Sequence, residues 1–466
     1  MKLNLFWVPV TVALFTTGCA TQHASMARNE PPRHVFEFKA GGKAGEFTSP
    51  AVPELDQTVP DDLTMAAAMA LALRKNPSLS GVSAEMRARD AATLQAGLLP
   101  NPELGVEVEN FGGKDTLQEF DGAETTIAFS QLVELGGKRG SRRMVASLDK
   151  TLAEWDYRSK KLDVLAATAK AFVEVLVAQD QVALNGELLK LAEQTTSAVS
   201  EKVDAGKVSP VEKSRAQIEL VAARTEASKA VRELEATRRR LAGFWGADRA
   251  DFVRTVGRLN GITALPSEAT LKAVLNDNPD LARWTTEIER SEAALSLAHS
   301  QAVPDFTLSA GVRNFQETDH NAFVVGASMP IPLFNRNQGG ISEARARIDK
   351  AQSEQRSVKI ALLTGLSDAW QSLSAAYTEA VGLRDEILPS AQVAYESTEL
   401  GYREGKLDFL QILDAQRTLF TVKRQYLLSL GAYHLADIEM ERIAGISLSD
   451  FANKNKNGPE DKESPE

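Results

Sequence analysis

The chain has 466 residues, of which 43% are hydrophobic and 25% charged, so it can form two or three ordinary packed domains. Its formal net charge of −10 argues against a nucleic-acid partner. Its one cysteine, Cys19, excludes an internal disulfide framework, and its five histidines have no metal-ligand spacing, so neither a metal site nor a cofactor is expected.

The first residues have the pattern of an export signal. Lys2 is the only charge before an apolar run from Leu5 to Phe15, which is shorter than the roughly 20 residues that span a bilayer. Gly18-Cys19 resembles the processing site of a bacterial lipoprotein, which predicts a signal peptide at 1–18 and a lipidated Cys19. An ordinary signal peptide with an incidental cysteine is the alternative. Residues 19–60 are polar and are predicted to be a tether, and no transmembrane helix is expected after processing.

A helix and two strands are predicted next. Asp61-Asp62 indicates a helix start, over about 62–98, with an early interruption at Asn76-Pro77. After Pro100 the apolar period becomes two, because Leu104, Val106 and Val108 alternate with Gly105, Glu107 and Glu109. Two strands, at about 103–111 and 124–133, are therefore predicted to form a hairpin with one apolar and one polar face.

The second half repeats this plan. A helix is predicted over about 267–302, with Asn278-Pro279 near its start, and strands follow at about 305–315 and 322–331. The first strand of each hairpin ends in Asn-Phe, at 110–111 and 314–315. Pro330 and Pro332 close the last strand, as expected for a strand that ends at a membrane boundary.

A very long helix is predicted after each hairpin, at about 139–203 and 341–403. Each would rise about 95 Å at 1.5 Å per residue. Apolar residues recur at alternating spacings of three and four, which is typical of coiled coils. They are Leu162, Leu165, Ala169, Phe172 and Leu176 in the first helix, and Leu366, Trp370, Leu373, Tyr377 and Ala380 in the second. Pro389 is predicted to kink the second helix.

The turns that end these helices are the strongest repeat signal. Gly206-Lys207 and Gly405-Lys406 are separated by 405 − 206 = 199 residues, and an Ala-Gln pair follows each turn at the same offset, at 216–217 and 415–416. Return helices are predicted to about 241 and 443. The chain is thus divided into a first repeat at 61–243, an irregular connector at 244–266, a second repeat at 267–445 and a disordered tail at 446–466.

The hairpins indicate a shared membrane barrel. Their length and their alternation match transmembrane β-strands, and one polar face carries Glu107, Glu109 and Arg313. Four strands leave two open edges, which lipid does not tolerate, so several chains must close the barrel. Two copies would give a barrel filled by side chains, and three would give twelve strands with room for a pore. A soluble helical bundle with hairpins is the competing fold, but it explains neither the export signal nor the apolar faces.

Four stretches carry a family resemblance: 99–104 (LPNPEL), 107–113 (EVENFGG), 133–139 (VELGGKR) and 330–340 (PIPLFNRNQGG). With the repeat, they resemble the TolC-like outer membrane efflux proteins over about residues 60–445, and most closely the outer membrane components of cobalt-zinc-cadmium type heavy-metal efflux systems. The resemblance implies a mainly α fold in a homotrimer, with a twelve-stranded barrel in the outer membrane lipid and a tube of long coiled-coil helices in the periplasm. It also implies a periplasmic adaptor protein and an inner-membrane pump of the resistance-nodulation-division class as partners.

The resemblance also suggests functional positions. The tip turns, with Gly206, Lys207, Gly405 and Lys406, would face the adaptor, although both lysines could simply be solvated. Asp414 falls where the family has a pore-constricting aspartate, and Gln411 stands where another acid is common. An interhelical salt bridge from Asp414 to Arg215 is the alternative role. His320 and the acidic loop 115–121 are expected to be incidental.

The leading functional hypothesis is a passive outer membrane exit duct for heavy-metal cations. The same architecture serving multidrug efflux or type I protein secretion is an alternative, and a periplasmic coiled-coil lipoprotein without a pore is a distant one. An enzyme is not expected, because no nucleophile, base and acid set is apparent.

Overall fold

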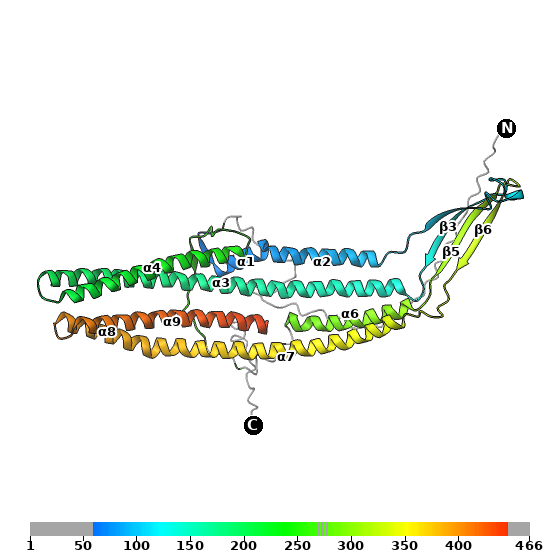
Figure 1. Cartoon of the computed structure of the whole chain (residues 1–466). Helices are drawn as coiled ribbons and strands as arrows, with labels where there is room; N and C mark the ends of the chain where they lie inside the picture. Colours follow the sequence, from blue (N-terminus) through cyan, green and yellow to red (C-terminus); the bar gives the residue numbers. More distant parts are fainter. Residues whose placement is uncertain are drawn as a thin grey trace, which may run out of the picture.

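The computed structural model describes residues 59–445, apart from 264, 266, 268–270, 272–274, 276 and 277. The predicted signal peptide, Cys19, nearly all of the tether and the tail at 446–466 lie outside the described residues. The described chain is a long rod of helices with a small β-sheet at one end and two helical turns at the other (Figure 1). None of its described helices is both long and apolar enough to cross a membrane.

The first helical segment begins later than predicted. Asp62–Thr64 forms a short strand, β1, which pairs in parallel with β4 (Arg254–Val256) of the connector. The Asp62 carboxylate receives hydrogen bonds of 2.7 and 3.0 Å from Arg254. The prediction of a helix from Asp62 was therefore wrong, because a partner 192 residues away holds this acid in a strand. Helix α1 (Met65–Lys75) starts at the Thr64 cap, and Asn76 separates it from α2 (Pro77–Ala96), as the interruption predicted.

The four predicted barrel strands form one antiparallel sheet in the order β2-β3-β5-β6. They are β2 (Glu103–Glu109), β3 (Glu124–Val133), β5 (Phe306–Phe315) and β6 (His320–Ser328). β2 stops two residues earlier than predicted, where Asn110 takes a positive φ of 59°. β6 stops before Pro330, which has no N–H for a ladder. The outer edges of β2 and β6 have no partner strand among the described residues.

The long helices run lengthwise along most of the rod, with shorter helices between them (Figure 1). Helix α3 (Lys138–Asp204) has 67 residues, which is about 100 Å. Its counterpart is interrupted: α7 (Gln338–Gly382) passes through a π-helical turn at Leu383–Ile387 into α8 (Leu388–Arg403). Pro389 has no N–H to donate to the preceding turn, so the predicted disturbance at this residue takes the form of a π turn.

The shorter helices meet end to end at mid-rod. In the first repeat, α4 (Pro210–Gly243) ends where α2 begins, and the Asn76 side chain donates to the Phe244 carbonyl at 2.8 Å. In the second repeat, α9 (Phe409–Ala444) ends where α6 (Pro279–Gln301) begins, and Asn278 donates to the Ile443 carbonyl at 2.7 Å. Each asparagine also caps its helix, since its oxygen accepts from a backbone N–H two residues on.

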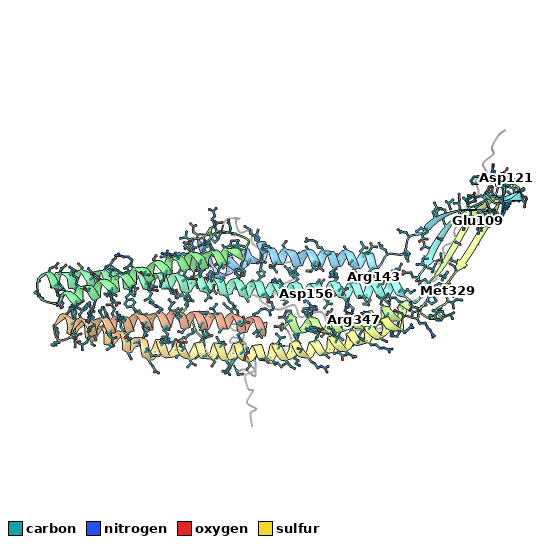
Figure 2. The ribbon with its side chains drawn as sticks, in the orientation of Figure 1. Glu109, Asp121, Arg143, Asp156, Met329 and Arg347 are labelled. Atoms are coloured by element: carbon teal, nitrogen blue, oxygen red, sulfur yellow. The ribbon has the colours of Figure 1, made fainter. Side chains whose placement is uncertain are left out.

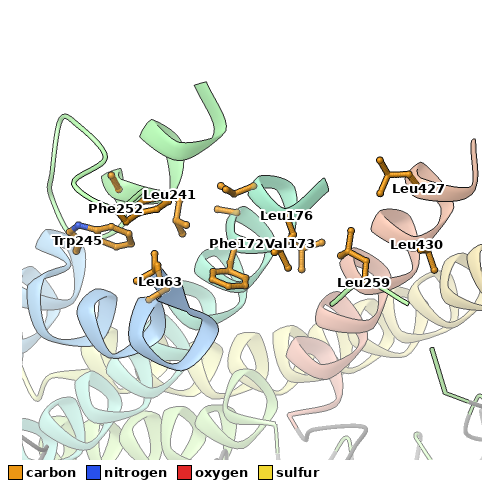
Figure 3. Close-up of a cluster of buried hydrophobic side chains, with 14 of the residues drawn as sticks. Leu63, Phe172, Val173, Leu176, Leu241, Trp245, Phe252, Leu259, Leu427 and Leu430 are labelled. Atoms are coloured by element: carbon orange, nitrogen blue, oxygen red, sulfur yellow. The ribbon is translucent and has the colours of Figure 1, made fainter. Parts of the chain in front are cut away.

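The main hydrophobic core lies at the same level, where the connector crosses the helices (Figure 3). Leu63 before α1, Phe172 of α3 and Leu241 of α4 pack there with Trp245 and Phe252 of the connector. The Gln179 side chain binds both backbone groups of Thr255, at 2.8 and 3.0 Å, which fixes the connector to α3. Apart from β4, the described residues of the connector form neither helix nor strand.

Candidate functional site

The two turns that join helices at the end of the rod, one between α3 and α4 and the other between α8 and α9, have the same geometry. Gly206 and Gly405 take φ values of +70° and +74°, a region that favours glycine. After each, a lysine N–H donates to the carbonyl five residues earlier, from Lys207 to Lys202 at 2.8 Å and from Lys406 to Gly401 at 2.9 Å. This is the Schellman arrangement of a helix end. Both lysine side chains are exposed, and Lys406 lies 2.6 Å from Glu404.

The two turns also pack on each other. Val199 of α3 and Ala216 of α4 form a buried cluster with Phe409 and Leu413 of α9. The Lys202 ammonium lies 4.1 Å from the centre of the Tyr402 ring, which adds a cation–π contact between the repeats. The tip of the rod is therefore one packed unit.

The structure gives Gln411 a local role. Its side chain accepts from the Asp408 N–H at 3.0 Å, and the Asp408 carboxylate accepts from the Gln411 N–H at 3.0 Å. This capping box starts α9 at the tip. Although it takes part in this cap, the Gln411 side chain remains exposed to solvent.

Asp414 lies one turn further along α9 and is exposed. It lines a hollow of about 430 Å³ with Arg215, Glu219 and Arg417. Among the described residues, no ion pair joins Asp414 to Arg215; Arg417 instead pairs with Glu219 of α4. The hydrogen bond to Glu219 raises the pKa of Arg417, and the charge of Asp414 adds to this rise. Asp414 thus lies beside an interhelical ion pair that it does not join.

The sheet at the other end has one polar and one apolar face. Arg313 donates to Glu124 at 2.8 Å and to Thr126 at 2.9 Å, and it lies 3.0 Å from Glu109. Glu103 and Glu107 lie on the same face and are exposed. The apolar face carries Phe323 and Val325, which are 91% and 82% exposed. One face therefore suits lipid and the other suits water.

The sequence indicated Glu107, Glu109 and Arg313 on the polar face, and the structure confirms that they share it. It did not indicate Glu124, because the Arg313–Glu124 pair joins residues 189 positions apart. His320 begins β6, and its ring contacts the Thr318 carbonyl. In the described part of the chain, no group of three or more His, Cys, Asp or Glu side chains could hold a metal ion.

The comparisons with known proteins decide the family. The outer membrane efflux protein family matches residues 68–247 and 270–446. This chain belongs to that family. The cobalt-zinc-cadmium resistance protein CzcC of Cupriavidus metallidurans is 33% identical over 394 residues, which cover 84% of this chain and 93% of CzcC. The nickel-cobalt-cadmium resistance protein NccC of Alcaligenes xylosoxydans xylosoxydans is 28% identical over 61% of this chain and 64% of NccC.

Solved structures confirm the fold. The Campylobacter jejuni CmeC outer membrane channel superposes with a TM-score of 0.70, at 15% identity, over 84% of this chain and 88% of CmeC. A CusC structure gives the same TM-score at 17% identity, over 84% of this chain and 94% of CusC. This outer membrane efflux protein is therefore a non-enzymatic exit duct, which lies in the outer membrane of a Gram-negative bacterium and extends into the periplasm.

Proposed function

We propose that this efflux protein is the exit duct for heavy-metal cations in a tripartite system. Three copies would share one barrel, a periplasmic adaptor protein would bind the tips, and a pump of the resistance-nodulation-division class would supply the energy. The similarity to CzcC carries this proposal, because it extends over 84% of the chain. The polar face of the sheet supports it: Glu103, Glu107, Glu109 and Glu124 outnumber the single Arg313, which favours cations over anions in a water-filled barrel.

The test is a strain that lacks this gene. It is exposed to zinc, cobalt, cadmium, copper, nickel and silver, and in parallel to common antibiotics and bile salts. Sensitivity confined to certain cations, restored by the gene, is the expected result. Sensitivity to drugs or bile salts alone would overturn the metal assignment and favour the multidrug alternative.

The proposed adaptor contact is tested at the tips. A Cβ added at Gly206 or Gly405 would meet no atom within 4 Å, so a large residue there would project outward. Replacing both with phenylalanine is expected to abolish metal resistance while trimers persist. The double variant Lys207→Ala/Lys406→Ala removes the charge at both tips without adding bulk, so it separates the effect of charge on resistance from the effect of shape. Wild-type resistance in the phenylalanine variant would contradict the adaptor contact.

Asp414 and Gln411 are proposed to line the narrowest part of the pore. Support comes from the exposed carboxylate of Asp414 beside the hollow near the tip of the rod. In planar bilayers, Asp414→Asn is expected to lower cation selectivity, with Gln411→Ala as the neighbouring comparison. Cation selectivity equal to that of the wild type would rule out Asp414.

Cys19 is proposed to carry the lipid anchor. Labelling with radioactive palmitate is expected to mark the wild-type protein, and Cys19→Ser is expected to abolish the label. A label that persists in Cys19→Ser would contradict this anchor.

A further inference from the structure

The two outer strand edges of the sheet are the starting point. Within the described chain, β2 and β6 each have one unpaired side, and exposed backbone groups cannot remain unpaired in lipid. Figure 2 places Glu109 at the far end of the sheet and Met329 at the end next to the helices. β2 therefore runs away from the helices and β6 runs back toward them, so β6 of one copy can pair with β2 of the next in antiparallel fashion.

The internal repeat relates two seams, a seam being the line along which two strands pair: the outer seam, between β6 and the next copy's β2, and the seam between β3 and β5 inside the chain. β5 corresponds to β2 with an offset of 204, since Leu308 matches Leu104 and Asn314 matches Asn110. β6 corresponds to β3 with an offset of 198: Gly105 pairs with Ala128, and its counterpart Ser309 pairs with Gly326 (326 − 128 = 198). The β3–β5 seam joins repeat one to repeat two, as the β6–β2 seam joins repeat two to the next copy's repeat one.

The observed β3–β5 register can be carried across by these offsets. Phe129 pairs with Ala310. The counterpart of Phe129 is Ala327 (129 + 198), and the counterpart of Ala310 is Val106 (310 − 204). We infer that two copies of this chain join with Ala327 of β6 directly opposite Val106 of the next copy's β2. This inference rests on the shared barrel of the proposed function and specifies its register.

The resulting pairs are chemically matched. On the lipid face, Val325 meets Val108, and Met329 meets Leu104, all of which are exposed in a single copy. On the water face, Gly326 meets Glu107, so the glycine leaves space for the longer side chain. A slip by one residue would turn the apolar side chains of one strand toward water. The real competitors are therefore slips by two, with Ala327 opposite Leu104 or Val108.

Disulfide trapping separates these registers. Directly opposite residues have Cβ atoms about 4.5–5.5 Å apart, whereas diagonal neighbours are about 7–8 Å apart. A disulfide needs roughly 3.5–4.5 Å, so only the directly opposite pair can close without a large shift. The variants in full-length protein are A327C/V106C, A327C/L104C and A327C/V108C. S328C/G105C tests the adjacent pair on the water face, which has the other hydrogen-bonding geometry.

The expected result is a covalent trimer on non-reducing gels for A327C/V106C or S328C/G105C, lost on reduction. A327C alone and the wild type, which both retain Cys19, serve as controls, and each variant must restore resistance in the deletion strain. Cross-linking through Leu104 or Val108 instead would overturn this register and leave the shared barrel intact. If no pair cross-links and the protein also runs as a monomer, the shared barrel itself would be overturned.

Discussion

The two repeats have the same plan but secure their mid-rod junctions differently. In both, an asparagine side chain caps one helix and binds a carbonyl at the end of another, at 2.8 Å from Asn76 and 2.7 Å from Asn278. The second junction adds charge, because Arg442 of α9 lies 2.6 Å from Asp163 and 2.9 Å from Asp280. The residue at the corresponding position of the first repeat is Gly243 (442 − 199), which has no side chain to offer.

This difference shows which interaction the architecture needs. The asparagine bridge is common to both repeats, so it serves the shared geometry, in which two short helices are aligned end to end along one long helix. The arginine with its two carboxylates belongs to the second repeat. We therefore expect pH and charge substitutions to affect mainly the second junction, and asparagine substitutions to affect both.

The largest effect is expected at Asp437, whose first-repeat counterpart is Arg238. Burial, and then the charge of Glu441, raises the pKa of Asp437 from an ordinary 3.8 to about 7, and one of its oxygens is buried without a hydrogen-bond partner among the described residues. Between these pH values the unfolded chain releases a proton that the fold retains. Stability therefore falls as the pH rises from about 4 to about 7, and the full cost remains above that.

Asp437→Asn removes this cost. At pH 8 it is expected to stabilise the protein by as much as about 4 kcal/mol, and near pH 4 it is expected to have little effect. Thermal unfolding in detergent, followed by helical circular dichroism at both pH values, measures the difference. Arg238→Gln is the matched variant and should leave the pH dependence unchanged. The prediction is wrong if Asp437→Asn keeps the pH dependence of the wild type.

The asparagine bridges come next. Asn278→Ala and Asn76→Ala each remove a helix cap and leave a carbonyl without its donor. The two losses together are expected to lower the stability of each variant by about 2–4 kcal/mol. Asn278 is fully buried and Asn76 is 8% exposed, so the larger loss is expected at Asn278. Serine at either position retains a capping oxygen but does not reach the far carbonyl, so Asn→Ser should recover about 1 kcal/mol. Equal stability of the Ala and Ser variants would show that capping contributes nothing.

Arg442 distinguishes the second junction further. Burial alone would lower the pKa of Arg442, but Asp280 and Asp163 outweigh it and raise the pKa. Arg442→Gln is expected to cost about 2 kcal/mol, less than a fully buried pair because Asp163 is partly exposed. The exposed Arg240–Glu233 pair of α4 is the control, and Arg240→Gln should cost under about 1 kcal/mol. Similar losses in the two variants, measured by unfolding midpoints, would contradict a special role of the junction.

The junctions also show which features of the fold could be predicted from the sequence and which could not. Strands, long helices and turns follow from local periodicity and from glycine and proline, so the sheet from Glu103 to Ser328 and both tips were predictable. Asn76-Pro77 and Asn278-Pro279 were visible as interruptions, but their carbonyl partners lie 168 and 165 residues away. The same holds for Asp62 with Arg254 and for Arg442 with its two carboxylates. A single sequence contains no pairing information over such distances, so these bonds needed the structure.

The smallest effect is expected where the repeats agree most closely, at the tip glycines. Gly206→Ala and Gly405→Ala each place a Cβ in open space, so the cost is backbone strain alone, about 1 kcal/mol per site. Gly136, at φ +68°, is the contrast, because a Cβ there would lie 2.9 Å from the Val303 side chain and 3.0 Å from the Ser300 carbonyl. Gly136→Ala should therefore lower the unfolding midpoint more than either tip variant. Equal losses at the two tips would show that the two turns are energetically equivalent. A clearly larger loss at one tip would instead reveal a contact of that glycine in the assembled protein.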